Sequence, residues 1–339
     1  MIAMKKQIAI VLTALCLTAA AGFPAAADEG NVVEDGQERV VRVVERDKAE
    51  VKNALKVLCA PSGIVAAADG SILVTDTYNK QLWCIKNGET TLYAGTTGVR
   101  DIYGEPVGGY NDGNNSESLF KLPWAVAQFK DGYAVSDTEN NAIRIVGTNI
   151  TQTNTGHKLS GYKDGNSYLA VFNRPTGLAF NGKDILYVAD TGNGAIRMVT
   201  TYGMVATLMT DLSEPTGLCY KNGSLYVAES GANRVLKITD GVVKEVYGSG
   251  TEGNADGPQA EARFSCPQGV TVADDGAVYI SDTGNGAVKK VVNGTVTTLF
   301  SSNPSVLENN LVSPLGLLVV GDQLYVCDNF SKKILILNR

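Results

Sequence analysis

Short apolar runs alternate with polar turns from residue 60 to the end of the chain. One period holds an apolar run such as LAF (178–180), a turn, and an alternating run such as LYVAD (186–190) that ends at an acid. A polar turn and two more short runs follow, such as AIRMV (195–199) and MVATLM (204–209). Short alternating runs bounded by Gly, Asn and Asp are typical of β-strands. The pattern therefore predicts an all-β chain with four short strands per period.

A fixed register repeats six times along the chain. Pro-x-Gly, or Pro-Trp-Ala in the second copy, opens each copy, and an acid closes the second strand 14 or 15 residues later. The pairs are Pro61 and Asp76, Pro123 and Asp137, Pro175 and Asp190, Pro215 and Glu229, Pro267 and Asp282, and Pro314 and Asp328. Six copies of four antiparallel strands are the pattern of a six-bladed β-propeller, with a solenoid as the alternative. The blade cores are expected to start near residues 60, 122, 174, 214, 266 and 313.

The sixth copy ends at its third strand, in residues 332–338. An unassigned stretch, residues 38–58, precedes the first Pro-x-Gly. We expect part of this stretch to supply the fourth strand of the last blade, because closing the ring removes an open sheet edge. RVVRVV (39–44) and VKNALKVL (51–58) are both candidates, and the second is also compatible with a short helix.

Two copies share the phrase DTGNGA: FNRPTGLAFNGKDILYVADTGNGAIRMV (172–199) and FSCPQGVTVADDGAVYISDTGNGAVKKV (264–291). Both resemble NHL repeats, and the resemblance extends over six copies in residues 60–339. It implies a six-bladed β-propeller. DTGNGA is then expected to form the turn between the second and third strands of a blade. Its acid can accept backbone N–H bonds, and its Gly, or an Asn in other copies, can adopt a positive φ.

The first 27 residues have the pattern of a secretory signal peptide. Lys5 and Lys6 precede an apolar run (8–23), and Ala25 and Ala27 stand at the small-residue positions of a cleavage site. An uncleaved anchor helix is the alternative, although the run is short for a membrane span. We therefore expect residues 28–37 to form a flexible mature N-terminus and residues 38–339 a single propeller. The expected location is secreted or cell-envelope associated, with no stable membrane span after cleavage.

The charge balance is acidic. The chain has 29 Lys and Arg against 35 Asp and Glu, a net charge of −6, and loss of Lys5 and Lys6 with the signal peptide gives −6 − 2 = −8. An acidic surface repels phosphate backbones, so no nucleic-acid partner is expected. Basic residues that recur after the turns alternate with acids and are interpreted as ordinary blade-surface charges. They are Lys80, Arg144, Arg197, Arg234, Lys289 and Lys332.

Five cysteines follow the signal peptide: Cys59, Cys84, Cys219, Cys266 and Cys327. An exported context permits disulfides, but the number is odd and none are closely spaced. Buried free thiols are favoured over a disulfide framework, and the sequence leaves both open.

Three long connectors share a motif. Asp112, Asp164 and Asp256 are each followed by Gly, and a Phe stands three residues before the next Pro. Loops rich in Asp and Asn can hold Ca²⁺, but these lack the spacing of an EF-hand. A self-capped turn with the Phe as a plug between blades is the simpler interpretation. No cofactor is therefore predicted, and Ca²⁺ is the one ion kept as a candidate.

Residues beside the six prolines are the candidate binding site. Entries to the first strand and turns after the second strand share one face of a propeller, so these residues are expected at the mouth of the central channel. The candidates are Ser62, Trp124, Arg174, Thr176, Glu214, Thr216 and Gln268. Arg174 and Glu214 are expected to pair, and Trp124 offers a flat ring for a sugar or a peptide aromatic. The alternative is inter-blade packing with an ordinary surface ion pair.

The catalytic patterns of six-bladed propellers are weak in this chain. His157 is the one histidine, which excludes a three-histidine zinc site within the chain, and the predicted innermost strands contain no acid. Glu214 alone makes a poor metal site. The sequence therefore predicts an exported, non-catalytic binding propeller that presents a loop face to a protein, peptide or glycan. A divergent metal-dependent lyase or lactonase of the same fold class is the alternative.

Overall fold

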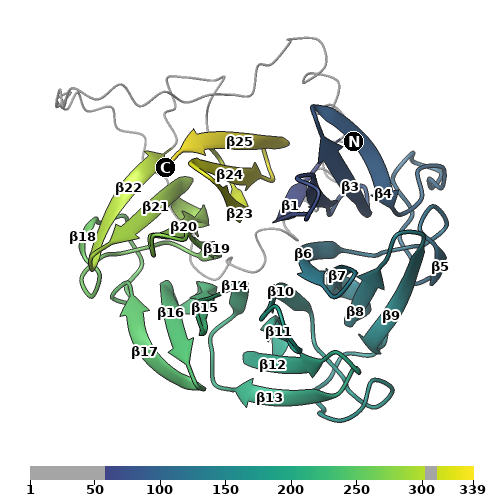
Figure 1. Cartoon of the computed structure of the whole chain (residues 1–339), viewed down its shortest axis with the longest axis horizontal. Helices are drawn as coiled ribbons and strands as arrows, with labels where there is room; N and C mark the ends of the chain where they lie inside the picture. Colours follow the sequence, from purple (N-terminus) through teal and green to yellow (C-terminus); the bar gives the residue numbers. More distant parts are fainter. Residues whose placement is uncertain (1–57, 302–310) are drawn as a thin grey trace.

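The computed structural model describes residues 58–301 and 311–339 and shows six sheets arranged around a central axis (Figure 1). Blade 1 contains β1 (Pro61–Ala66), β2 (Ile72–Asp76), β3 (Gln81–Lys86) and β4 (Glu89–Ala94). Blade 2 contains β6 (Pro123–Phe129), β7 (Gly132–Asp137), β8 (Ala142–Val146) and β9 (Ile150–Gly156), with β5 (Gly113–Asn114) outside β9. Blade 3 contains β10 (Pro175–Phe180), β11 (Ile185–Asp190), β12 (Ala195–Thr200) and β13 (Val205–Met209).

The remaining blades follow the same plan. Blade 4 contains β14 (Pro215–Lys221), β15 (Ser224–Glu229), β16 (Arg234–Thr239) and β17 (Val242–Tyr247). Blade 5 contains β19 (Pro267–Val272), β20 (Val278–Asp282), β21 (Ala287–Val292) and β22 (Thr295–Ser301), with β18 (Gly257–Pro258) outside β22. Blade 6 contains β23 (Pro314–Val320), β24 (Gln323–Asp328) and β25 (Lys333–Asn338).

The predicted fold class is confirmed: the chain is all-β, with six blades of antiparallel strands. Within residues 58–301 and 311–339, blade 6 has three strands and nothing pairs with the outer edge of β25. The predicted closing strand, the signal peptide and the flexible N-terminus lie outside the described residues. In the described part of the chain, no helix is both long and apolar enough to cross a membrane.

The Gly of Pro-x-Gly is required because neighbouring inner strands approach each other closely. A Cβ atom built on Gly177 would lie 1.8 Å from the carbonyl oxygen of Thr216 in the next blade. A Cβ atom on Gly316 would lie 2.3 Å from the carbonyl oxygen of Ser62, where blade 6 meets blade 1. The repeated Gly therefore permits the contacts that close the ring.

The DTGNGA phrase forms the predicted turn between the second and third strands. Short 3-10 helices follow the acid in four blades: η1 (Thr138–Asn140), η2 (Thr191–Asn193), η3 (Ser230–Ala232) and η4 (Thr283–Asn285). The closing residue is left-handed, with φ of 58° at Gly194 and 50° at Asn141. Asp190 Oδ1 accepts the backbone N–H of Asn173 at 2.8 Å, as the acid was predicted to do.

The Thr of DTGNGA joins one blade to the next. Thr191 Oγ1 donates to the carbonyl oxygen of Pro215 at 2.7 Å, and Thr283 Oγ1 donates to that of Pro314 at 2.6 Å. The phrase therefore combines an acid that fixes its own inner strand, a hydroxyl that holds the next blade, and a Gly that closes the turn.

Four of the cysteines, Cys59, Cys84, Cys219 and Cys327, are free thiols in the described structure. Burial raises the pKa of Cys219 and of Cys327. These two therefore behave as small apolar side chains rather than as reactive thiolates.

Candidate functional site

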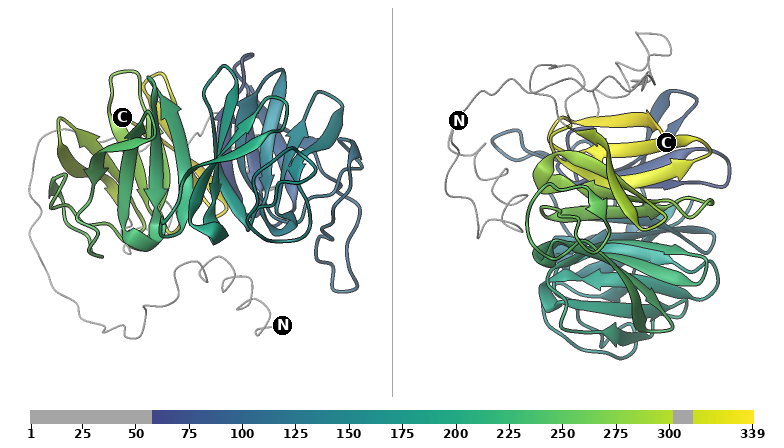
Figure 2. Two further views of the ribbon diagram at one scale, coloured as in Figure 1. Left: turned by 90° about the horizontal axis from the view of Figure 1, so that it is seen from below. Right: turned by 90° about the vertical axis from the view of Figure 1, so that its left-hand side faces the viewer.

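We define the turn face as the face of the disc that carries the turns between the second and third strands of each blade, including η1–η4. The inner strands also begin on this face, so it contains all the positions beside the prolines. Figure 2 shows the disc from two sides, with these short turns gathered along one face.

Three of the predicted site residues hold the scaffold together. Ser62, Thr176 and Thr216 are buried. Ser62 Oγ donates to the carbonyl oxygen of Trp124 in blade 2 at 2.7 Å. The hydroxyls of Thr176 and Thr191 lie 2.6 Å apart, and the hydroxyl of Thr216 lies 2.6 Å from that of Ser230. These hydroxyls already bond within the protein.

Gln268 is also buried, in the inner strand of blade 5. Its Nε2 lies 3.4 Å from Sγ of Cys266, the residue that precedes the proline of the same strand. The structure therefore places Gln268 among protein neighbours, as it does the three hydroxyl residues.

Trp124, Arg174 and Glu214 remain accessible on three consecutive blades. Arg174 is exposed, and the other two are half-buried. The backbones of Arg174 and Glu214 have φ of 52° and 48°. Asn141 Oδ1 accepts the N–H of Arg174 at 2.8 Å, which fixes this strained backbone. An aromatic ring, a cation and an acid are thus accessible at the starts of the inner strands of three consecutive blades.

The predicted ion pair between Arg174 and Glu214 is not a contact pair: among the described residues, no nitrogen–oxygen distance within 4 Å joins them. The two charges still interact across the gap. Burial raises the pKa of Glu214, and the nearby guanidinium of Arg174 lowers it by less, so the net shift is upward.

The Asp of the long connectors forms an internal clamp, shown clearly in blade 3. Asp164 Oδ1 bonds Nη2 of Arg197 at 2.5 Å, and Thr207 donates its backbone N–H to Asp164 Oδ2 at 3.0 Å. Arg197 Nη1 reaches Asp190 Oδ2 at 2.6 Å. The guanidinium lies over the ring of Phe172, 5.1 Å from its centroid. The connector is thereby fixed to the outer strands of the blade.

Blades 2 and 5 repeat this clamp. Asp112 bonds Arg144 at 2.6 Å, and Asp256 bonds Lys289 at 2.8 Å. The plugs Phe120, Phe172 and Phe264 are fully buried, as predicted, whereas the Asp side chains bond residues of the outer strands in place of the predicted self-capped turn. The interpretation of the basic residues as surface charges is wrong for Arg144, Arg197 and Lys289, which are fully buried. The sequence could not show this, because the connector that covers each cation lies 25–35 residues away.

The described residues contain no group of three or more His, Cys, Asp and Glu side chains placed to hold a metal ion. Each clamp carboxylate bonds the cationic side chain of its own blade. The loops of Asp112, Asp164 and Asp256 thus have an internal counter-ion.

A projecting hairpin that the sequence pattern did not predict is formed by residues 99–107, which we call the finger. It belongs to the connector between β4 and β6 and rises from the turn face beside blade 1 (Figure 2). Its tip residues Ile102 and Tyr103 are 91% and 71% exposed. The sequence signal was the short stretch DIYG, which indicates a turn but not the direction in which the turn points.

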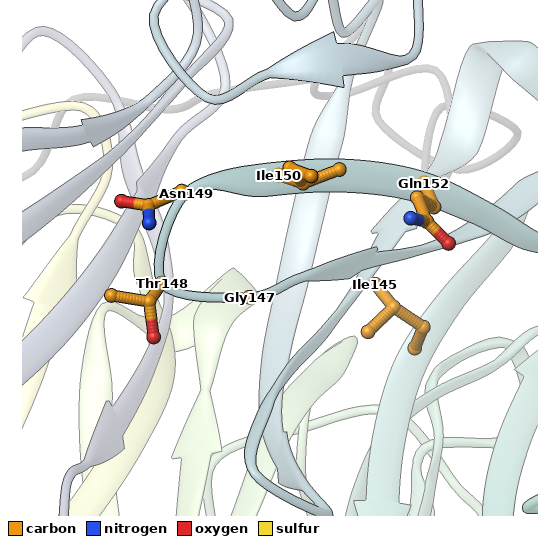
Figure 3. A pocket seen from close by; sticks show the side chains of 6 residues that line it. All are labelled: Ile145, Gly147, Thr148, Asn149, Ile150 and Gln152. Carbon is orange, nitrogen blue, oxygen red and sulfur yellow. The ribbon is translucent and has the colours of Figure 1, made fainter.

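A surface hollow lies at the β8–β9 hairpin, away from the turn face (Figure 3). Its lining residues are Ile145, Gly147, Thr148, Asn149, Ile150 and Gln152. The side-chain amide of Asn115 donates to the carbonyl oxygens of Gly147 and Thr148 at 3.0 and 3.2 Å. The hollow contains none of the predicted site residues.

The NHL repeat family model matches residues 58–85, 172–197 and 264–291. Protein SUPPRESSOR OF QUENCHING 1, chloroplastic, from Arabidopsis thaliana is 30% identical over 51% of this chain and 20% of its own length. NHL repeat-containing protein 2 from Homo sapiens is 25% identical over 86% of this chain and 49% of its own length. The chain therefore spans half or less of the length of these relatives.

Similar solved structures are also propellers. A structural genomics protein of unknown function from Bacteroides thetaiotaomicron aligns with a TM-score of 0.62 and 18% identity, over 83% of this chain and 70% of that one. An inactive virginiamycin B lyase from Staphylococcus aureus aligns with a TM-score of 0.53 and 16% identity, over 83% and 95%. At these identities the similarity shows the fold alone. The six observed blades and the repeat matches show that this chain is a six-bladed β-propeller that contains NHL repeats in residues 58–85, 172–197 and 264–291.

Proposed function

We propose that the protein is an exported binding propeller whose turn face holds a protein, peptide or glycan partner at the channel mouth. The observation that carries this proposal is the accessible group of Trp124, Arg174 and Glu214 on three consecutive blades. Neighbouring hydroxyl groups bond within the scaffold, so these three side chains are the ones free to meet a partner. Function on a repeated scaffold resides in such variable positions.

The scaffold suits this role because it is held rigidly. Hydroxyl groups tie each inner strand to the next blade, as Thr191 does with Pro215 and Thr283 with Pro314. A site on a preorganised framework loses little conformational entropy on binding. The combination of a ring with both signs of charge favours a peptide or protein surface over a neutral glycan, because a peptide can satisfy all three groups.

A display selection tests the proposal. The full chain is used to select binders from a phage-displayed random peptide library and from a glycan array. We expect the selected ligands to lose affinity for Trp124→Ala and for Arg174→Glu, and to keep it for Lys183→Ala, an exposed residue in the β10–β11 turn on the opposite face. Ligands that bind all variants equally, or the absence of any ligand, would contradict the proposal.

A further inference from the structure

The finger is a closed hairpin with an ordered turn. The backbone N–H of Val107 donates to the carbonyl oxygen of Val99 at 3.0 Å. Asp101 Oδ1 accepts the backbone N–H groups of Tyr103 and Glu105 at 2.8 and 2.9 Å. The side chain of an Asp that bonds its own backbone two residues on is a common means of fixing a turn. The tip therefore has a defined shape before any partner arrives.

The base of the finger is fixed to the turn of blade 1. Lys80 Nζ donates to the carbonyl oxygen of Pro106 at 2.8 Å, and the hydroxyl of Tyr78 donates to the carboxylate of Glu105. Burial, together with Glu105, raises the pKa of Tyr78 to about 12. The hydroxyl thus remains protonated and able to donate at neutral pH. These contacts support the finger where it leaves the disc.

The charged side chains of the finger bond its own backbone or its base, and its large apolar side chains face solvent. Asp101 accepts backbone N–H groups of the turn, and Glu105 accepts the hydroxyl of Tyr78. Arg100 Nη1 donates to the carbonyl oxygen of Gly104 at 2.8 Å. Ile102 and Tyr103 form the tip. Large apolar side chains held in this way on a surface mark interaction sites, and a preformed loop avoids the entropic cost of ordering on binding.

We propose that the finger inserts Ile102 and Tyr103 into an apolar pocket of a partner protein that binds the turn face. This inference rests on the proposed function and adds the partner's class and the second point of contact. A convex apolar tip is buried well only by a concave apolar surface, which a folded protein provides and a glycan chain does not. The finger lies on the same face as Trp124, so one partner can reach both.

Charge distinguishes a protein pocket from a lipid surface. The finger has one cation, Arg100, and two acids, Asp101 and Glu105, and the whole chain has a net charge of −6. Segments that dock on membranes combine apolar tips with clustered Lys and Arg, because biological membranes carry anionic lipids. An acidic finger on an acidic disc lacks that attraction.

A second exposed aromatic pair offers a matched control. Tyr168 and Tyr202 are 88% and 89% exposed. Tyr202 lies in the β12–β13 turn, on the face opposite the turn face, and its neighbour Gly203 packs closely against Ser167. This pair is about as exposed as the finger tip but lies elsewhere on the disc. Variants of the pair therefore distinguish specific docking of the finger from non-specific hydrophobic association.

The first experiment is photo-crosslinking in the native cells, with p-benzoylphenylalanine at position 103 or 202 of the full chain. The captured protein is purified, and its affinity for the full chain is measured by calorimetry. We expect an adduct from position 103 and not from 202. Ile102→Ser with Tyr103→Ser should weaken binding of the purified partner roughly tenfold or more. Tyr168→Ser with Tyr202→Ser should leave it within about twofold.

Four outcomes would overturn the inference: no adduct from position 103, equal adducts from both positions, unchanged affinity of the finger variant, or an adduct with a second copy of this chain. Finger-dependent sedimentation with phosphatidylglycerol and phosphatidylcholine vesicles would instead assign the tip to a membrane. Loss of affinity in Trp124→Ala without loss in the finger variant would leave the proposed function standing and the finger inference wrong. The reverse result would retain the finger and exclude the channel mouth.

Discussion

The connector between β4 and β6 contains two loops in which apolar and charged side chains are arranged in opposite ways. Its second half is a clamp: Phe120 is buried, and Asp112 binds the buried Arg144. Its first half is the finger, in which charged groups hold the backbone and Ile102 and Tyr103 face solvent. One connector can therefore stabilise a blade with one half and expose large apolar side chains with the other.

The clamp depends on a buried cation with several partners. Arg197 bonds both Asp164 and Asp190, and also the carbonyl oxygens of Lys163 and Val171 at 2.8 and 3.2 Å. Removing one member of such a set leaves buried charges and carbonyls without partners, which costs far more than the pair contributes when intact. The finger has no comparable buried charge, so the two loops should differ sharply in their effect on stability.

The largest effect is expected from Arg197→Ala. We expect the free energy of unfolding to fall by about 3–5 kcal/mol, because Asp190 stays buried without its counter-ion. Denaturant unfolding of the full chain measures this change. Arg174→Ala, an exposed arginine close by in sequence, is the control and should change stability by at most about 0.5 kcal/mol. Equal losses in the two variants would show that the clamp contributes no more to the free energy of unfolding than an exposed arginine does.

The clamp of blade 5 predicts a pH dependence. Burial raises the pKa of Asp282 to about 6, and Lys289 bonds Asp256 rather than reaching Asp282 as Arg197 reaches Asp190. A carboxyl whose folded pKa lies above its unfolded value of 3.8 contributes stability below about pH 4 that is lost as the pH rises through about 6.

Lys289→Arg should reduce that dependence, because a guanidinium can bond both acids as in blade 3. We expect the variant to gain on the order of 1 kcal/mol relative to the parent at pH 7 and less at pH 4. Unfolding curves at a series of pH values give the comparison. A variant whose stability follows the same pH profile as the parent would contradict this account of Asp282.

The finger base predicts a smaller, local effect. Tyr78→Phe removes the hydrogen bond to Glu105 and should weaken the attachment by about 1 kcal/mol. The expected result is faster hydrogen exchange of the finger amides, including that of Val107, with no change in the amides of β11. Unchanged exchange in the finger would show that Tyr78 does not support it.

The finger tip should have the smallest effect on stability. Ile102→Ser with Tyr103→Ser is expected to change the free energy of unfolding by less than about 0.5 kcal/mol, because both side chains are largely exposed. Thermal melts of the variant and the parent check this. A large loss of stability would mean that the tip packs on the protein itself and is not displayed.

The sequence was sufficient for the blades because each blade depends on local patterns. The spacing from Pro175 to Asp190 places the inner and second strands in register, and these two residues are paired in the structure. DTGNGA was identified as a turn for the same reason. Burial of a side chain by a distant segment could not be predicted from local patterns. The sequence around Arg144 indicated a surface charge, but the connector that contains Asp112 covers it in the structure.

The channel mouth shows the same limit. Ser62 and Thr216 lie next to the prolines that begin their inner strands, but their hydroxyl groups bond partners in the scaffold that no local pattern reveals. Trp124 is half-buried and Arg174 is exposed. The finger was missed because its sequence specifies a tight turn, while Lys80 and Tyr78 of the preceding blade set its direction.

Hydrogen–deuterium exchange of the full chain with the purified crosslinked partner tests the central claim most directly. The account predicts slower exchange in the finger and in the segments around Trp124, Arg174 and Glu214, with the β12–β13 turn unchanged. Slower exchange confined to the β12–β13 turn and the opposite face, with the finger unchanged, would contradict the assignment of binding to the turn face.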